Sequence, residues 1–343
     1  MITFLVVGRN DGFGLNLSKR TAISLNFFAS LCEDDDDEIV YVDCNTPEGE
    51  ITLTESVFDT LTAEARRRIK TFRISGELMY GAIGNTPMPF SDELSRNVGI
   101  RRSNPSNSWI LSTNCDLVIQ PISGSLHEVI KNLSPQLYHC PRHSIAYEQW
   151  RNFNRMNVES VADFCSGLAQ RGLRFPPEVD HPWQRFQSVG DFQLAPRSQW
   201  IDIGGCEEGM SLWGHSDANN AKRFSLLNKC PKTPDLGNKI HLFHLDHNLK
   251  KAVSANADIV PPNDTKRWIA DVFQYKSHNP PNWGLQGVDL PSPSLSELGN
   301  IMDDSHTILK LHRRPRRSLS VLRIKFSSIL SRLASRIMDR LKL

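Results

Sequence analysis

The sequence of 343 residues predicts an α/β protein built on a mostly parallel sheet flanked by helices. Short apolar runs typical of buried strands alternate with segments of helical periodicity, and the runs at 39–42 and 109–113 are each followed by polar side chains. Alternation of this kind favours a parallel sheet with its ligand site at the carboxyl ends of the strands. The hydrophobic fraction of 39% is ordinary for a soluble protein and sufficient for a large core.

The expected elements follow one another along the first part of the chain. Short apolar runs predict buried strands, and apolar residues repeated every three or four positions predict helices. Strands are expected at 2–8, 39–42 and 109–113, and helices at 15–31, 55–70 and 123–133. The acidic run Glu33–Glu38 predicts a solvated loop.

The rest of the chain divides less sharply. Between about 150 and 190 the pattern predicts loops and short helices, whereas residues 277–296 are rich in Pro, Ser, Asn and Gly and predict a linker or a wrapping loop. We therefore expect a main domain over 1–276 with halves at 1–120 and 121–276, a linker or wrapping segment over 277–312, and a tail over 313–343.

The tail 313–343 holds ten Lys or Arg residues and one acid, while the rest of the chain has an excess of acids. Its apolar residues recur with a 3.6-residue period, which predicts a basic amphipathic helix. Such a helix docks either on the protein's own core or on an anionic membrane surface. We favour the membrane, because each Lys or Arg near it adds about 1 kcal/mol of attraction. Nucleic-acid binding is not expected, since the basic residues are confined to this helix without interleaved aromatics.

The signals for a cellular compartment are few. No apolar run approaches the ~20 residues of a membrane-spanning helix, and the N-terminus lacks the basic start and longer apolar stretch of a signal peptide. The seven Cys are scattered without a C-x-x-C pair, which favours reduced thiols over disulfides. We expect a cytoplasmic protein that associates peripherally with the inner face of the membrane.

Polar residues around the second and third strands are candidates for nucleotide binding. Asp43 and Asn45 follow the second strand, where they can bond a nucleoside, although an Asp there also suits a simple turn. Arg96, Asn97 and Arg101 precede the third strand. A guanidinium fork fits a diphosphate, but such clusters are also common as surface charge.

Residues 114–116 follow the third strand, and the alternation of side chains points Asn114 and Asp116 the same way. A carboxylate at this place suits Mg²⁺ or Mn²⁺ on a diphosphate. The run His241-x-x-His244-x-x-His247 adds possible nitrogen ligands, of which we select His244 and His241. Their i, i+3 spacing suits one face of a helix or a turn, whereas on a strand the two would point to opposite faces.

A further group of candidates lies between residues 204 and 223. Glu207 and Glu208 precede the pair Trp213-Gly214, and Asp217 follows it. An aromatic face can stack on a pyranose, and a carboxylate can take the proton of an acceptor hydroxyl. A surface loop is the alternative interpretation.

In this order the motifs resemble those of A-type-fold glycosyltransferases, close to the large inverting family 2 and to the β-1,4-galactosyltransferase-like catalytic segment. The resemblance covers about residues 1–250, with weak cover at 135–185. It is carried by residues 9–11, 42–45, 95–103, 114–116, 190–194, 205–208, 213–217 and 223. Asn114 departs from it by replacing the first acid of the Asp-x-Asp motif, and Ser216 by replacing a Glu.

The resemblance implies a glycosyltransferase A-type, Rossmann-like fold. It also implies inverting transfer of a sugar from a nucleotide sugar, in the simplest case UDP-linked, to a glycan or lipid-linked acceptor, as in surface polysaccharide biosynthesis. Asp217 would be the catalytic base, and Asp116 with His244 or His241 would hold Mn²⁺ or Mg²⁺. The donor would meet Arg9, Asn10, Asp43, Asn45, Asn97, Arg101 and Asn114. The acceptor would meet Asp191, Glu207, Glu208, Trp213 and Gly214.

Two alternatives compete with this hypothesis. A nucleotidyltransferase would show a Gly-rich loop after the first strand, which residues 8–14 match in part. A non-catalytic, membrane-associated relative of the fold would bind neither UDP nor Mn²⁺.

Overall fold

A computed structural model of the chain describes residues 1–172, 190–247, 260–293 and 295. All of them belong to one compact unit, Met1–Leu298. The predicted amphipathic helix in 313–343 lies outside the described residues, as do residues 173–189 of the weakly patterned stretch 150–190. Among the described residues, no helix is both long and apolar enough to cross a bilayer.

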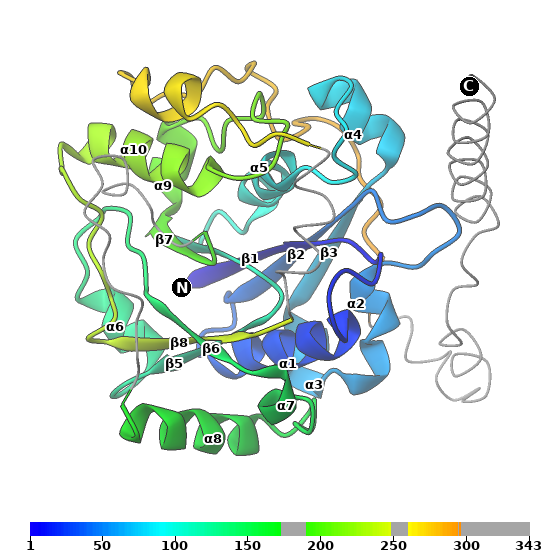
Figure 1. Cartoon of the computed structure of the whole chain (residues 1–343), viewed down its shortest axis with the longest axis vertical. Coiled ribbons are helices and arrows are strands. Elements are labelled where there is room, and N and C mark those ends of the chain that lie inside the picture. The colour runs from blue at the N-terminus through cyan, green and yellow to red at the C-terminus, as the bar shows by residue number, and fades with distance from the viewer. Residues whose placement is uncertain (173–189, 248–259, 294, 296–343) are drawn as a thin grey trace, which may run out of the picture. The chain divides into compact units, whose positions relative to one another are not determined.

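The centre of the unit is a five-stranded sheet, visible edge-on in Figure 1. Four of its strands are parallel, and β7 alone runs antiparallel to its neighbour β4. The strands follow the order β3 (Ile69–Ile74), β2 (Glu38–Cys44), β1 (Ile2–Gly8), β4 (Trp109–Thr113) and β7 (Phe192–Pro196). The predicted mostly parallel sheet is thus confirmed.

Helices cover both faces of this sheet, which is why its inner strands are apolar on both sides. Figure 1 shows α1 (Leu17–Ser30) and α5 (Asp92–Arg102) on opposite faces. Leu5 and Val98 belong to the core on the α5 side, while Ile23 and Phe27 of α1 belong to a second core. The other helices are α2 (Leu53–Ser56), α3 (Ala63–Arg68), α4 (Gly76–Ile83), α6 (Leu126–Lys131), α7 (Tyr147–Trp150), α8 (Val158–Gln170), α9 (Arg197–Asp202) and α10 (Ser216–Asn228), with short turns of helix at Phe58–Thr60 and Lys266–Ala270.

A second, three-stranded sheet lies beside α1. Its order is β5 (Leu117–Pro121), β8 (Ile240–Leu245) and β6 (Arg142–Ile145), and β5 pairs antiparallel with β8. In this register Leu117 is opposite His244. The residue before Leu117 therefore meets the end of β8, although more than 120 positions separate them in the chain.

The predicted helix 55–70 was wrong as a single element. Thr52 and Thr62 each cap a new short helix through their side-chain oxygens, and Leu61 between them is extended. The chain then enters β3 at Ile69, a strand that the sequence pattern did not reveal. Two N-caps ten residues apart divide the segment, because each fixes a helix start.

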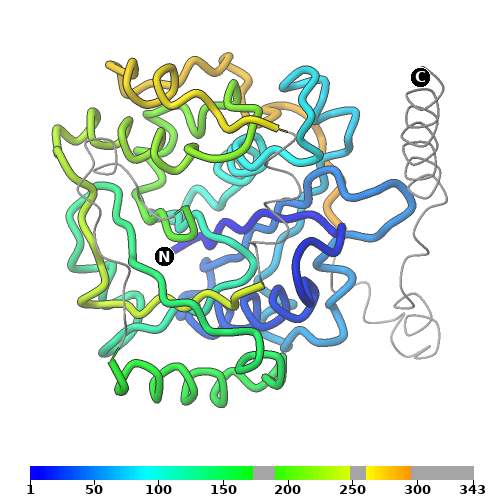
Figure 2. Tube along the Cα trace, viewed as in Figure 1, coloured from blue at the N-terminus to red at the C-terminus, as the bar shows by residue number. Residues whose placement is uncertain are grey.

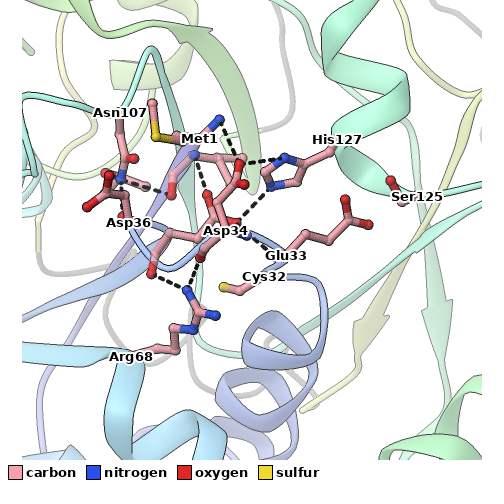
Figure 3. A network of polar contacts seen from close by, with 12 residues as sticks. Met1, Cys32, Glu33, Asp34, Asp36, Arg68, Asn107, Ser125 and His127 are labelled. Atoms are coloured by element: carbon pink, nitrogen blue, oxygen red, sulfur yellow. Dashed lines mark hydrogen bonds and ion pairs between the residues drawn. The ribbon is translucent and has the colours of Figure 1, made fainter.

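The prediction of a solvated loop at Glu33–Glu38 was wrong for its last two residues. Asp37 and Glu38 are buried. The Asp37 carboxylate accepts hydrogen bonds from the backbone N–H groups of Ile2, Glu33 and Asp34, and Glu38 begins β2. Figure 3 shows this acidic segment approached by His127 and Arg68 from different sides.

Residues 260–293 pass over the α5 side of the sheet (Figure 2). Trp283 and Leu290 are buried in the core there. Arg101 and Arg102 of α5 donate to backbone carbonyls of residues 281–288. The part of the expected linker that the structure describes is therefore packed against α5.

Candidate functional site

The candidate site lies at the carboxyl ends of the central strands, around Asp116 between β4 and β5. The Asp116 Oδ2 atom lies 3.4 Å from Nε2 of His244, on β8, and 3.3 Å from Nε2 of His247 just beyond it. All three residues are buried, and their ligand atoms lie within 4.8 Å of one another. One carboxylate and two imidazoles converge here from two separate parts of the chain.

A buried arginine completes this cluster. Arg20, in the first turn of α1, is 1% exposed and places Nη1 2.7 Å from Asp116 Oδ2. Its Nε and Nη2 atoms donate to the backbone oxygens of Leu15 and Phe13 at 3.0 and 2.8 Å. The loop after β1 therefore holds the guanidinium against the carboxylate.

The electrostatics of Asp116 follow from these partners. Burial raises the pKa of a carboxyl group, but hydrogen bonds from His244 and His247 and the charge of Arg20 outweigh it and hold the Asp116 pKa well below its usual range. These partners therefore favour the ionised form of Asp116.

Three buried atoms of the cluster lack partners. Asp116 Oδ1, His244 Nδ1 and His247 Nδ1 have no hydrogen-bond partner among the residues that the structure describes. Buried polar atoms are nearly always paired, so unpaired ones mark a place for a ligand. An unpaired carboxylate oxygen beside two imidazoles is a donor set that fits Mn²⁺.

His241 is not part of this cluster. It lies on β8 opposite Gln120, three residues before His244, so the alternation of the strand sends the two side chains to opposite faces. The choice of His241 in the sequence prediction is therefore replaced by His247. His247 belongs to the same His-rich run but lies two residues beyond β8, where the chain has left the strand, so the alternation of the strand does not indicate it.

The predicted donor residues of the first two strands lie together. Asp43 Oδ2 accepts hydrogen bonds from Thr46 Oγ1 at 2.8 Å and from the Leu53 N–H at 3.3 Å, while Oδ1 lacks a partner among the described residues. Burial raises the pKa of Asp43 to about 6, against the lowering effect of those hydrogen bonds. One Asp43 oxygen is thus buried without a hydrogen-bond partner among the described residues.

The loops after β1 and β2 are tied to each other around Asp43. Arg9 Nε donates to the Asn45 oxygen at 2.6 Å, and the Asn10 N–H donates to Thr46 Oγ1 at 2.8 Å. Asn45 has a φ of 55° and binds the Pro89 oxygen through its amide. Arg9, Asn10 and Asn45 therefore shape the rim of the predicted nucleoside site through backbone contacts.

Asn114 is engaged within the protein on both sides of its amide. Its Oδ1 accepts from Arg96 Nη2 at 2.9 Å, and its Nδ2 donates to Asp191 Oδ1 at 2.7 Å. The other oxygen of Asp191 pairs with Arg142. The carboxylate beside position 114 is therefore that of Asp191, which accepts a hydrogen bond from the Asn114 amide and is neutralised by the Arg142 guanidinium.

Asp217 has a different environment in the first turn of α10. Its carboxylate accepts backbone N–H groups at the helix start, remains half-buried, and has no ion pair among the described residues. Burial raises its pKa to about 6, and the charges of Asp191 and Asp92 add to that. A Cβ built on Gly190 would lie 3.1 Å from the Asp217 Cβ, so the start of β7 and the start of α10 are in close contact.

Trp213 and Gly214, which precede α10, form an exposed surface. The Trp213 side chain is 36% exposed, and its Nε1 donates to the Val260 oxygen at 2.7 Å, which fixes the indole. Gly214 has a φ of 77°, a conformation that favours glycine. An anchored, partly exposed indole close in sequence to Asp217 suits the stacking of a sugar ring.

Glu93, which no sequence pattern indicated, lies beside Ser216. It is buried at the start of α5, where burial and the charge of Asp92 raise its pKa to about 8 while a hydrogen bond to Ser216 lowers it. Ser216 is the residue that departs from the Glu of the resembled motif. No sequence signal connects residues 93 and 216, which only the fold brings together.

Four other predicted site residues are engaged elsewhere. Arg101 stacks on Trp283, 3.8 Å from the ring centroid, at the end of α5 that faces the amino ends of the strands. Asn97 donates to the Cys206 oxygen and to Glu208, and Glu208 accepts the Gly284 N–H. The structure therefore does not bring Arg101, Asn97 or Glu208 to Asp116.

Glu207 is likewise engaged, through His278. These side chains fasten residues 204–208 and 277–284 to α5. Sequence order alone did not separate them from the residues of the site, because all lie in motifs of the resembled pattern.

The chain was compared with family models, curated proteins and solved structures. Neither a family model nor a curated protein matches the chain. Among solved structures, it is similar to the mannosyltransferase PcManGT from Pyrobaculum calidifontis in complex with GDP-Man and Mn²⁺, at 13% identity over 74% of this chain and 59% of that chain, with a TM-score of 0.44.

It is similar as well to S. aureus TarS 1–349 in complex with UDP, at 11% identity over 71% of this chain and 60% of that chain, with a TM-score of 0.43. A third structure is GalNAc-T7 with UDP, GalNAc and Mn²⁺, at 10% identity over 88% of this chain and 48% of that chain, with a TM-score of 0.42. This chain spans about three fifths of the TarS and PcManGT chains. The case for function therefore rests on the residues of the site.

Proposed function

We propose that this protein is an inverting glycosyltransferase that moves a sugar from a nucleotide sugar, in the simplest case UDP-linked, to a hydroxyl group of an acceptor. The observation that supports it is the row of carboxylates at the carboxyl edge of the central sheet. Asp43, Asp116 and Asp217 come from three distant segments, and the first two each keep an unpaired buried oxygen. Ligands of parallel α/β sheets bind at this edge.

The donor half of the site serves two parts of a nucleotide sugar. Asp43, on the rim made by the loops after β1 and β2, binds the nucleoside through its unpaired oxygen. Asp116, His244 and His247 would hold a divalent cation, Mn²⁺ or Mg²⁺. When bound, the cation supplies positive charge against the diphosphate that leaves. The resemblance of motifs and the unpaired Asp116 Oδ1 beside two imidazoles support this assignment.

Asp217 is the catalytic base in this proposal. Its carboxylate takes the proton of the acceptor hydroxyl while that oxygen bonds to the anomeric carbon and the bond from the carbon to the diphosphate breaks. With a pKa of about 6, Asp217 is mostly ionised at pH 7 and basic enough to accept a proton. Asp191 is less suited to the role, since Asn114 and Arg142 already bind both of its oxygens.

The acceptor is proposed to be a glycan or a lipid-linked sugar that stacks on Trp213. Its place in surface polysaccharide biosynthesis, and a peripheral position on the inner face of a membrane through residues 313–343, belong to the same proposal. The basic, amphipathic composition of that tail supports the membrane partner.

The test is a screen of UDP- and GDP-sugars for sugar transfer and for hydrolysis, with Mn²⁺, with Mg²⁺ and with a chelator. We expect one nucleotide sugar to be consumed, with release of the nucleoside diphosphate. Pyrophosphate release from UTP plus a sugar phosphate would instead identify a nucleotidyltransferase. A chain that binds neither UDP nor Mn²⁺ in calorimetry would contradict both enzymes.

A further inference from the structure

We propose that Arg20 is a built-in counter-cation of the diphosphate site, which weakens the binding of a divalent cation and lets a nucleoside diphosphate bind without one. The proposal rests on the proposed function, because it concerns the same Asp116 cluster. It adds a positioning residue that lies outside every motif of the resembled pattern.

Hydrogen bonds and burial hold Arg20 in the cluster. Its side chain is 1% exposed, and its three nitrogen atoms are fixed by the Leu15 oxygen, the Phe13 oxygen and Asp116 Oδ2. A guanidinium stays charged at every accessible pH. Arg20 is therefore a permanent positive charge 2.7 Å from the carboxylate.

The net charge of the ligand set disfavours a bound divalent cation. His244 and His247 are neutral when they bind a metal, so Asp116 is the one anionic ligand in the cluster. Arg20 cancels that charge. A divalent cation then meets a cluster with no net charge, and an anionic diphosphate meets a neutral cluster where Asp116 without Arg20 would be anionic.

The loop after β1 packs closely against Arg20. Gly14, with a φ of 71°, passes so close that a Cβ on it would lie 2.9 Å from Arg20 Nη2 and 2.7 Å from His247 Nδ1. The Phe13 ring meets the His247 ring edge-on at 5.7 Å. The loop after β1 thus packs against both Arg20 and the candidate metal ligand His247.

The test compares Arg20→Gln with Arg68→Gln in the full chain. Arg68 is a matched control, because it too is a buried guanidinium bound to a carboxylate and to two backbone carbonyls, but at the amino ends of the strands. Circular dichroism and thermal melting check that both variants fold. Calorimetry then measures the binding of Mn²⁺ alone, of UDP with a chelator, and of UDP with saturating Mn²⁺.

For Arg20→Gln we expect at least about tenfold tighter Mn²⁺ binding and at least about tenfold weaker UDP binding in the chelator, since the cluster changes from neutral to anionic. With saturating Mn²⁺ the UDP affinity recovers to the wild-type value. Arg68→Gln keeps all three wild-type affinities. Arg20→Lys, which retains a charge, stays closer to the wild type than Arg20→Gln.

A folded Arg20→Gln that binds Mn²⁺ no more tightly than the wild type overturns the inference and leaves the glycosyltransferase intact. If Arg20→Gln does not fold, the wild type decides, because UDP binding that requires Mn²⁺ absolutely also overturns it. Binding of UDP by the wild type in the chelator supports it. Failure of the wild type to bind either Mn²⁺ or UDP under any condition removes the proposed function as well.

Discussion

The two edges of the central sheet carry similar clusters with opposite character. At the carboxyl edge, the buried Asp116 meets two imidazoles and Arg20. At the amino edge, the buried Asp37 meets His127 at 2.8 Å, with Asp34 and Arg68 beside it (Figure 3). One cluster groups a carboxylate with two His and the other groups two carboxylates with one His, each in a geometry that could hold a metal ion.

The clusters differ in how far their polar atoms are satisfied. Asp37 Oδ1 accepts the Ile2 N–H, and Oδ2 accepts the N–H groups of Glu33 and Asp34 as well as His127. Asp116 Oδ1 has no partner among the described residues. A carboxylate fully bound by backbone N–H groups fastens the chain, whereas one with an unpaired buried oxygen is prepared for a ligand. The presence of His and Asp does not by itself distinguish the two clusters. The hydrogen bonds that each buried carboxylate accepts do distinguish them.

The largest expected effect concerns Asp217. We expect Asp217→Asn to reduce sugar transfer at least about a thousandfold, because it removes the base while an amide keeps the shape. UDP affinity and the melting temperature should stay at or above wild-type values, because the raised pKa means that folding works against the charge of Asp217. Steady-state kinetics, calorimetry and thermal melting measure the three quantities. Loss of UDP binding together with activity would show a structural role instead.

The pH dependence of kcat/KM tests the role of Asp217 as well. With a base of pKa about 6, kcat/KM should fall about tenfold for each pH unit below that value and level off above it. Asp43, whose pKa is also raised to about 6, adds to the fall if donor binding needs its charge. The profile is measured from pH 4.5 to 8 in enzyme that stays folded by circular dichroism. A flat profile down to pH 4.5 would contradict Asp217 as the base.

A smaller effect separates the two candidate histidines at the carboxyl edge. We expect His247→Gln to weaken Mn²⁺ binding by about 10- to 100-fold, because it removes one of three ligands. His241→Gln, on the opposite face of β8, is the matched control and should change Mn²⁺ affinity less than twofold. Calorimetry of Mn²⁺ binding measures both. Equal losses of Mn²⁺ affinity in the two variants would contradict His247 as a metal ligand and would indicate that both substitutions disturb the local structure.

The smallest effect on activity is expected at the amino edge. Asp37→Asn should cost about 2 kcal/mol of unfolding free energy, because an amide faces the backbone N–H groups with one oxygen in place of two. In the wild type, the lowered pKa of Asp37 stabilises the fold above the unfolded pKa, and this stability is lost as the pH falls through the folded value. Urea unfolding measures the change, with kcat as the control. A loss of kcat without a loss of stability would make this cluster functional.

Part of the site could be predicted from the sequence for a definite reason. Asp43 and Asp116 follow apolar strands, and the carboxyl ends of parallel strands share one edge, so their proximity follows from the strand pattern. Asp217 followed from its motif. His247 belongs to the predicted His-rich run, but its selection required the course of the chain after β8 ends at Leu245. The misplaced Arg101 lies on the same helix as Arg96 but in its last turn, at the end away from the carboxyl edge.

The sequence by itself determined the alternation of strands and helices, the acids at the strand ends and the basic composition of the tail, because these depend on residues close together in the chain. The tertiary structure alone decided that Arg20 neutralises Asp116 and that Asp191 is occupied by Asn114 and Arg142. Such pairings join side chains about 50 to 100 positions apart. Their formation depends on burial and on the exact register of strands, which no local pattern contains.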